Sequence, residues 1–381
     1  MFADVIQGAR KLGRALQISR RPAVERVPRE TFMVPSLGSA PIANLGPRGE
    51  RAASLQKLEL TDHEVERAKA ARFKVGVVLH TLDSDWARQQ VDGITATLRD
   101  YGAGVVDIID CEFAVARQIA SLDAMIGRRP DAIISIPVDD TETAEAHRRV
   151  GEAGITLVLM DSAPRGLQPG RDYAAVVSAD NRANGLIAAE TLAPHVPSGG
   201  TVGLIGFDAD FFATDEREAA FRQWFQGHRP DAVVLRKGFH DPSEAGSVTE
   251  TFLRANHAIN ALFVVWDTPA LAAVEAARKL GREVAITTVD LGEEAAMELA
   301  AGGLIKGLGA QQPYDQGVAE ALAVIKALLG SPLPAWVAVP ALTVTRENVL
   351  EAFERVWHVP PPARLLEAYD LARAAPGSSV V

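Results

Sequence analysis

The sequence predicts an α/β protein with two doubly wound lobes, each built on a parallel sheet and joined by a multi-strand hinge. Three observations lead to this prediction. From Phe73 onward, apolar runs of strand length alternate regularly with segments of helix length. The chain has 381 residues, which is long enough for two domains and additional segments. The strand candidates are also too numerous for one sheet of ordinary width, whereas two sheets would each keep a separate core.

An N-terminal extension and linker occupy residues 1–72. Apolar side chains stand among Arg and Lys in residues 1–30, which predicts an amphipathic helix that docks loosely or lies on a membrane surface or a partner. This segment has no continuous apolar core or clear cleavage site, so as written it does not read as a secretory signal. Residues 34–60, rich in Pro, Gly and Ser, predict a linker. Thr61 and Glu64 have the capping-box spacing and predict a helix that leads into the first strand.

The alternating region supplies the strands and helices of both lobes. The strand candidates are 73–80, 105–109, 132–136, 156–160, 175–178, 201–206, 232–237, 261–265, 285–289 and 304–310. The helix candidates are 88–101, 114–127, 140–153, 182–194, 213–227, 242–256, 268–280, 292–302 and 313–329. Alternation of this kind is typical of βαβ units, in which right-handed crossovers join parallel strands.

The boundary between the lobes is expected near Ser178–Asn181, where a strand passes into a helix through a polar Asp-Asn pair. Residues 338–344 predict one late strand that carries the chain back across the hinge, and 346–357 predict a C-terminal helix. The expected division is lobe 1 over 73–179 and 312–340, lobe 2 over 180–311 and 341–347, and a C-terminal helix and tail over 348–381.

Composition and motifs argue against several classes of function. The net charge of −10 argues against nucleic acid as a partner, because a phosphate backbone requires a basic face. A single cysteine, Cys111, rules out a disulfide within the chain. No apolar run reaches the ~20 residues that span a bilayer, so no stable membrane span is expected. The chain lacks the GxSxG, P-loop, HExxH and GxGxxG motifs, and its histidines show no metal-ligand spacing, so we expect no enzyme activity, cofactor or metal.

Polar and aromatic side chains follow strand after strand where each apolar run stops. The clearest case is 73–87, in which a buried strand leads to Trp86 just ahead of a helix. Because parallel strands end at the same edge of a sheet, we expect these side chains to meet in one cleft. Trp86 is either a stacking platform there or a core residue, and any single Asp is either a ligand contact or a helix cap. The candidate ligand-binding residues are Asp83, Ser84, Trp86, Asp161, Phe211, Arg217, His240, Trp266, Asp267, Asp290 and Gln311.

This set combines carboxylates, amides, one Arg and flat aromatic rings. Sugars and polyols need such a combination, because their hydroxyls pair with planar polar groups while their C–H faces lie on rings. The collective pattern therefore favours a small sugar or sugar alcohol as the ligand.

An ordered series of segments covers most of the chain. In order, these are VGVVLHTLDSDWARQQVDGI, PDAIISIPVDD, TLVLMDSAP, VVSADNRANGLIAAETL, ATDEREAAF, FVVWDTPALAAVEAARKLG, ITTVDLGEEA and GAQQPYDQGVAEAL. With this series, residues 73–345 resemble the type I periplasmic sugar-binding proteins, the ribose-, xylose- and galactose-binding group of ABC-transporter receptors. The resemblance implies the two-lobed fold of that family, with an N-terminal extension in this chain.

The resemblance also implies individual ligand contacts. It assigns them to Asp83, Ser84 and Trp86 in the first loop, to Arg217 in a helix, near His240, and to Asp267, Asp290 and Gln311. Two positions depart from the family pattern. Ser162 follows Asp161 where the family has Arg, and Trp266 stands where it has Asn. A pentose, a sugar alcohol and a smaller polyol all stay open as the ligand.

The function implied by the resemblance is that of a solute-binding receptor that closes on its ligand and presents it to an ABC-type permease, in the periplasm or cell envelope. The alternative is a cytoplasmic or membrane-associated ligand sensor related to sugar-responsive regulators. Such regulators carry an N-terminal helix-turn-helix, and residues 1–72 show no such pattern, so this sensor would not bind DNA.

Overall fold

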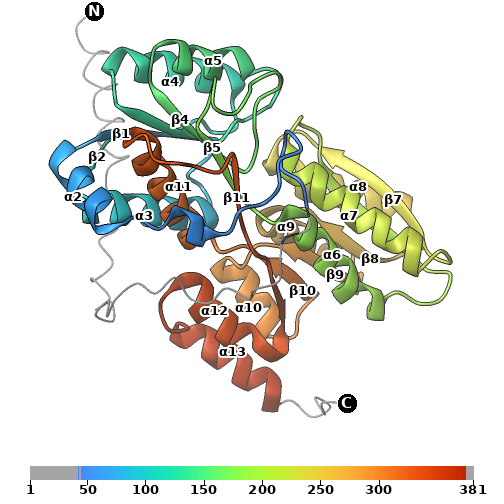
Figure 1. Ribbon diagram of the computed structural model, residues 1–381. Helices are drawn as coiled ribbons and strands as arrows, with labels where there is room; N and C mark the ends of the chain where they lie inside the picture. Colours follow the sequence, from blue (N-terminus) through green and yellow to red (C-terminus); the bar gives the residue numbers. More distant parts are fainter. Residues whose placement is uncertain (1–41, 43, 375–381) are drawn as a thin grey trace, which may run out of the picture. The chain divides into compact units, whose positions relative to one another are not determined.

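A computed structural model describes residue 42 and residues 44–374. The amphipathic helix predicted within residues 1–30 lies outside the described residues. The described chain forms two six-stranded, mostly parallel sheets covered by helices, which confirms the predicted class with two doubly wound lobes (Figure 1). No helix among these residues combines the length and the apolar character needed to cross a bilayer.

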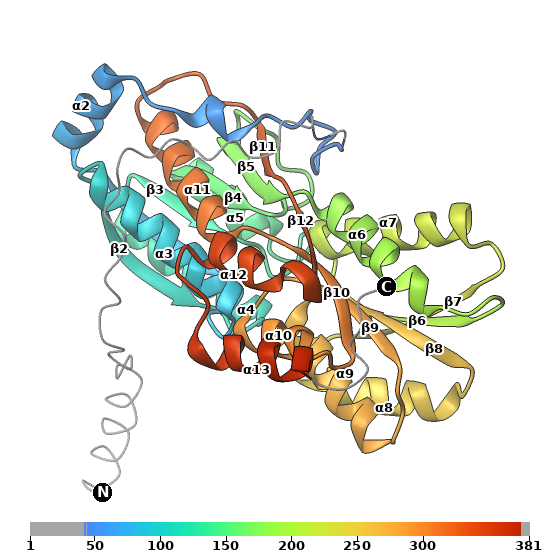
Figure 2. The same cartoon turned by 90° about the horizontal axis from the view of Figure 1, so that it is seen from below.

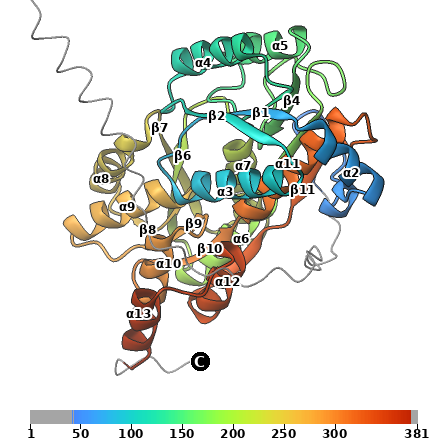
Figure 3. The same cartoon turned by 90° about the vertical axis from the view of Figure 1, so that its left-hand side faces the viewer.

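The sheet of lobe 1 has the strand order β11-β5-β4-β3-β1-β2, and every neighbouring pair is parallel. Its strands are β1 (Lys74–Leu79), β2 (Gly104–Asp110), β3 (Ala132–Ser135), β4 (Thr156–Met160), β5 (Ala175–Ala179) and β11 (Trp336–Val339). The central strands are buried on both faces, which explains their continuous apolar sequences. Two helices cover each face, as Figure 3 shows. They are α4 (Val115–Arg128) with α5 (Ala144–Glu152), and α3 (Asp85–Asp100) with α11 (Pro313–Leu328).

The sheet of lobe 2 has the order β12-β10-β9-β8-β6-β7, with β12 antiparallel to β10 and the other pairs parallel. Its strands are β6 (Thr201–Phe207), β7 (Val233–Phe239), β8 (Ile259–Val264), β9 (Ala285–Val289), β10 (Ile305–Ala310) and β12 (Leu342–Thr345). Figure 2 shows α6 and α7 on one face and α8 and α9 on the other. The helices are α6 (Asn181–Leu192), α7 (Phe212–His228), α8 (Ala245–Ala255), α9 (Asp267–Lys279) and α10 (Glu293–Ala300), with short 3-10 turns η2 (Ala193–His195) and η3 (Pro242–Glu244).

The chain passes between the two sheets three times, between β5 and α6, between β10 and α11, and between β11 and β12. The single strand predicted over 338–344 is wrong, because this segment forms β11 and β12, which belong to different sheets. Pro340 lies between them and has no N–H with which to continue a ladder. β12 runs antiparallel because the chain enters lobe 2 directly at the edge where the parallel strands of that lobe end.

The segment before the first helix is more than a linker. Ala53 forms a parallel bridge with Val337 and so adds to the outer edge of the lobe 1 sheet. Leu58, in the 3-10 turn η1 (Leu55–Leu58), is fully buried. The guanidinium of Arg48 donates to the carbonyl oxygens of three residues in the loop after β4. The linker predicted over residues 34–60 is therefore wrong for its described part, because backbone pairing and one buried side chain fix it to lobe 1.

Both ends of the alternating region carry additional helices. The capping box of Thr61 and Glu64 is confirmed at the start of α2 (Asp62–Ala71). The predicted C-terminal helix is present as η4 (Arg346–Asn348) followed by α12 (Val349–Trp357). A further helix that the sequence reading did not specify, α13 (Ala363–Ala374), packs against α10, and Arg364 pairs with Glu293 at 2.7 Å.

Helices α3 and α11 approach each other closely because glycines face each other across the contact. A Cβ atom on Gly93 would collide with the carbonyl oxygen of Tyr314, and one on Gly317 would collide with that of Gln90. Both carbonyl oxygens belong to the backbone of packed helices, so neither oxygen can move aside unless its whole helix shifts.

The Gly93→Ala substitution is expected to lower the free energy of unfolding by about 1–3 kcal/mol, the usual cost of overpacking a tight contact. Gly127, in α4, is a matched control because its Cβ would meet nothing within 4 Å. Gly127→Ala should stabilise the protein by about 0.5–1 kcal/mol, since Ala has the higher helix propensity. Urea unfolding measures both changes, and equal effects of the two substitutions would contradict the close packing of α3 on α11.

Candidate functional site

A cavity of about 490 Å³ lies between the carboxyl ends of the two sheets, and residues of both lobes line it. Each lining segment follows a strand, so the edge rule of parallel sheets explains why residues so distant in sequence meet here. All of the predicted site residues except His240 line the cavity: Asp83, Ser84, Trp86, Asp161, Phe211, Arg217, Trp266, Asp267, Asp290 and Gln311.

His240 is the one predicted site residue that does not line the cavity; it is exposed. The preceding residue, Phe239, ends β7 and is buried, with its ring centroid 5.6 Å from that of Phe207. Because successive side chains of a strand point to opposite faces, burial of Phe239 turns His240 away. Asp241 and Ser243, a little further along the loop, line the cavity in its place.

The sequence reading missed other lining residues, most clearly those after β2. Asp110, Glu112 and Phe113 line the cavity and come directly after a predicted strand. The expectation that residues directly after a strand line the cavity therefore applies equally to the loop after β2. Further lining residues outside the candidate set are His80, Thr81, Phe207, Thr214, Asp241, Pro242, Ser243, Thr268 and Ala272.

Aromatic rings of the two lobes meet at the cavity wall. Phe113, of lobe 1, lies nearly parallel to Trp266, of lobe 2, with ring centroids 6.5 Å apart. Phe113 also meets Phe207 edge to face at 6.1 Å. Trp86 packs edge-on against His80 at 5.6 Å and is partly buried, so it is both a packed residue and part of the cavity wall. The two contacts of Phe113 remove apolar surface of both lobes from water and so favour the association of the lobes.

Buried charged groups form the polar side of the cavity. Arg217 is 4% exposed, and its Nε donates to Asn181 Oδ1 at 2.8 Å while its Nη1 donates to the Val265 carbonyl at 3.0 Å. The Gln311 amide donates to Asp290 Oδ1 at 2.6 Å. These bonds hold one guanidinium and one carboxylate in fixed positions between the lobes.

The remaining buried carboxylates are held by backbone and amide donors. Asp161 accepts from the Ala179 N–H at 3.2 Å and from Gln316 Nε2 at 3.0 Å. Asp267 accepts from the Gly292 N–H at 2.8 Å. Asp161 and Asp290 both have a positive φ, of 53° and 77°, which residues with a side chain rarely adopt. Strain of this kind is typical of functional sites, where the surrounding structure holds it in place.

Burial governs the protonation of these groups. Burial raises the pKa of Asp267, and the nearby Asp290 raises it further. Burial also raises the pKa values of Asp290 and Asp161, while the positive charge of Arg217 acts in the opposite direction on both. The pKa of His80 is lowered by burial to about 3, so its imidazole is neutral near pH 7.

Two buried polar atoms at the cavity lack hydrogen-bond partners within the described part of the chain. They are Nε1 of Trp86, which is a donor, and Oε1 of Gln311, which is an acceptor. An unpaired buried polar atom is costly, and both atoms are shielded from water within side chains of the cavity wall. Among residues 42 and 44–374, no group of three or more His, Cys, Asp or Glu is placed to hold a metal ion.

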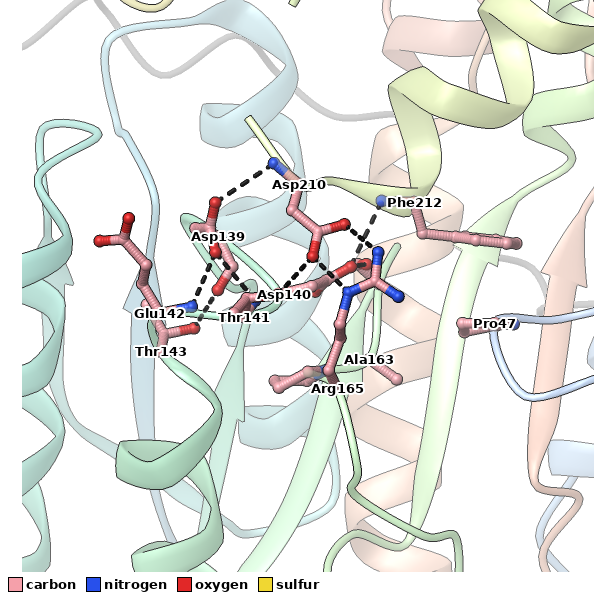
Figure 4. Close-up of polar contacts among 12 residues, drawn as sticks. Pro47, Asp139, Asp140, Thr141, Glu142, Thr143, Ala163, Arg165, Asp210 and Phe212 are labelled. Carbon is pink, nitrogen blue, oxygen red and sulfur yellow. Dashed lines mark hydrogen bonds and ion pairs between the residues drawn. The ribbon is translucent and has the colours of Figure 1, made fainter. Parts of the chain in front are cut away.

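A second set of contacts between the lobes lies around Asp210, and we call it the Asp210 clasp (Figure 4). Asp210 belongs to lobe 2 and accepts from Arg165 Nη2 at 2.6 Å and from Thr141 Oγ1 at 2.6 Å, both of lobe 1. The Asp140 N–H also donates to the Asp210 carbonyl at 2.8 Å, and the Asp210 N–H donates to Asp139 Oδ2 at 3.2 Å. The clasp therefore joins the loops that follow β3, β4 and β6.

Asp140 is the buried member of the Asp210 clasp, at 5% exposed. Its Oδ2 accepts from Ser162 Oγ and, across the lobes, from the Phe212 N–H at 3.3 Å, while its Oδ1 has no partner among the described residues. Burial raises the pKa of Asp140 to about 7, despite these two donors. Elsewhere between the lobes, Asp85 Oδ2 accepts from the N–H of Glu293 at 2.9 Å, at the start of α10.

Comparison with known proteins gives a family. A sequence profile described as the periplasmic binding protein domain matches residues 75–332. The chain is 24% identical over 223 residues to the ribose import binding protein RbsB of Bacillus subtilis, covering 58% of this chain and 71% of that protein. It is 22% identical over 286 residues to the RbsB of Haemophilus influenzae, covering 75% of this chain and 96% of that protein.

Solved structures show the same fold. An ABC transporter solute-binding protein of Bacillus halodurans with bound myo-inositol has a TM-score of 0.67 at 24% identity, covering 74% of this chain and 98% of its own. One from Agrobacterium vitis bound with alpha-D-tagatopyranose has a TM-score of 0.68 at 22% identity, covering 73% of this chain and 96% of its own. The resemblance drawn from the sequence motifs is confirmed at the level of family and fold.

The contribution of Asp140 to the free energy of unfolding should fall as the pH rises from about 4.5 to 7.5. Asp140 has a folded-state pKa of about 7, above the ordinary value of 3.8, so in this window the folded state binds more protons than the unfolded chain. This contribution is present at low pH and is lost as the pH rises through the folded pKa. Asp140→Asn, which mimics the protonated form, should reduce the fall by about 1 kcal/mol or more.

Urea unfolding across this pH range measures the effect. Asp123→Asn is a matched control, because Asp123 is an exposed carboxylate on α4 that pairs with Arg149. It should keep the pH dependence of the parent protein. If Asp140→Asn and Asp123→Asn behave alike, Asp140 does not carry the burial-raised pKa.

Proposed function

Because the chain belongs to the periplasmic binding protein family, we propose that it captures a small sugar or sugar alcohol in the cavity between its lobes and presents it to an ABC-type permease. The observation that carries this proposal is the cavity itself, which carboxylates and Arg217 line together with Trp86 and Trp266. Hydroxyls would bond to the charged groups, and the C–H faces of the ligand would lie on the rings. The relatives named above bind ribose, tagatopyranose or myo-inositol, which supports this class of ligand.

Binding would work by closure of the lobes. A ligand that contacts residues of both lobes stabilises the closed state over the open one, and only this difference in affinity drives the switch. Closure also removes water from the cavity and so strengthens each hydrogen bond to the ligand. The permease would recognise the closed form, and the site of action would be the periplasm or the cell envelope, as in the family.

The alternative, a ligand sensor related to sugar-responsive regulators, has less support, because the relatives named above are import binding proteins. The proposal assigns binding to this chain and no catalysis.

A thermal-shift screen against pentoses, hexoses and sugar alcohols tests the proposal. A ligand at ~100 times its dissociation constant adds about 2.7 kcal/mol to stability, which raises the melting temperature measurably. Trp86→Ala removes one ring of the cavity wall, and Arg217→Ala removes its buried guanidinium, so each should abolish the shift. Arg217→Lys, which keeps the charge but not the fork of donors, should weaken binding and guards against misfolding of the Ala variant.

Trp224→Ala is the control for loss of a tryptophan, because Trp224 stacks on His228 away from the cavity. It should keep the full shift. If the Trp86 and the Arg217 variants both bind the ligand with full affinity, the proposed site is wrong.

The Asp210 clasp should affect affinity without any contact with the ligand. Arg165→Ala removes the ion pair with Asp210 and so favours the open state. We expect ligand affinity to fall about two- to fivefold, in line with the modest worth of an exposed ion pair. Arg149→Ala, which removes an exposed ion pair with Asp123 inside lobe 1, should leave affinity unchanged. Titration calorimetry measures both, and an unchanged affinity for Arg165→Ala would mean that the clasp does not favour closure.

A further inference from the structure

The charges that face the cavity do not balance. Three carboxylates at the cavity are buried, Asp161 at 2%, Asp267 at 8% and Asp290 at 7% exposed. One positively charged side chain, the guanidinium of Arg217, lines the same cavity. No other Lys or Arg in the described part of the chain lines it. His80 contributes no charge near pH 7, because burial keeps its imidazole neutral. The buried lining therefore has two more potential negative charges than positive ones.

The acidic excess extends beyond the buried residues. The other ionisable residues that line the cavity are all acidic: Asp83, Asp110, Glu112 and Asp241. Behind Asp161 lies a further buried carboxyl group, that of Glu320, which shares the amide of Gln316 with it. Burial raises the pKa of Glu320 well above its ordinary value, and the negative charge of Asp161 raises it further, since two like charges in a buried site repel each other.

Arg217 cannot offset this excess alone. Two of its three guanidinium nitrogens are bonded to Asn181 and to the Val265 carbonyl, both outside the set of buried carboxylates. Its positive charge lowers the pKa values of Asp161 and Asp290, whereas Asp267 has Asp290 and Asp85 as charged neighbours, both of which act in the unfavourable direction. A buried carboxylate without a cation is costly, and closure of the lobes around it increases that cost.

The aromatic wall suits a positive charge as well as the C–H face of a sugar. Trp86 and Trp266 line the same cavity as the three carboxylates. A cation over the face of Trp is attracted by the ring, and more strongly once water is excluded.

We infer that the cavity selects a polyhydroxylated ligand that carries a positively charged amine, an amino sugar or amino polyol, over its neutral and anionic counterparts. This inference rests on the proposed function and narrows its ligand class. The ammonium group neutralises part of the buried negative charge of Asp161, Asp267 and Asp290, and the hydroxyls bond to the other polar groups of the lining. A neutral sugar leaves the charge excess in place, and an anionic sugar adds to it.

Matched pairs of ligands test the inference on the full chain by titration calorimetry. The pairs are D-glucosamine with D-glucose, D-galactosamine with D-galactose, and 1-amino-1-deoxysorbitol with sorbitol, and D-glucuronate is the anionic member. We expect the amine of at least one pair to bind tenfold or more tighter than its neutral partner, and no detectable binding of glucuronate. Equal or tighter binding of the neutral member in every pair that binds would overturn the inference and leave the proposed function intact.

Loss of charge at single positions should remove the preference. Asp290→Asn keeps the shape of the side chain, and Asn tolerates the positive φ at this position. In this variant, and in Asp267→Asn, the affinity ratio of amine to neutral ligand should fall at least fivefold. Glu275→Gln makes the same change of net charge at an exposed position on α9 and should keep the ratio.

The outcomes separate the two proposals. If the affinity ratio of amine to neutral ligand is unchanged in both Asp variants, these carboxylates do not recognise the amine. That result would contradict the inference. If no member of any pair binds, and the wider screen of pentoses, hexoses and sugar alcohols also gives no shift, both the inference and the proposed function fail.

Discussion

Parallel strands that are joined by helical crossovers must all end at the same edge of their sheet, and in this protein two such edges face each other. The three passages of the chain between the sheets keep the edges opposed. The segments at the ends of β1, β2, β4, β6, β7, β8, β9 and β10 therefore deliver side chains to one shared cavity, whatever their position in the sequence. Trp86 and Gln311 stand at opposite ends of the alternating region, and both line that cavity because of this single geometric constraint.

The same constraint brings carboxylate groups together at buried positions of the cavity. Asp161, Asp267 and Asp290 all follow strands, and so they line the same cavity as Arg217. Left alone, such a group of carboxylates would repel itself and resist burial. The protein tolerates it through donors fixed by the fold, among them the N–H groups of Ala179 and Gly292. The positive φ values of Asp161 and Asp290 indicate that positioning of these groups takes precedence over local backbone preference.

The lobes hold each other by contacts of two kinds. Aromatic contacts such as Phe113 against Trp266 are insensitive to pH and salt, whereas the Asp210 clasp consists of charged and polar groups. Asp140 combines features of both kinds of contact. It is buried like a core residue, and burial raises the pKa of its carboxyl group to about 7. Through its bond with the Phe212 N–H, Asp140 joins the two lobes at a point separate from the aromatic wall.

The order of the elements and the two-lobed class could be predicted from the sequence, and so could the position at the cavity of nearly all the candidate residues. Apolar periodicity and polar residues at strand ends are local properties of the chain, which is why they can be recognised without a structure. Tertiary structure decided what depends on contacts between distant segments. Burial of Phe239 turned His240 outward, and Pro340 divided one apparent strand between two sheets. Asp140 and Asp210 became a clasp only when loops from different lobes met. No local pattern encodes such meetings, because the energy that fixes them comes from packing across the whole fold.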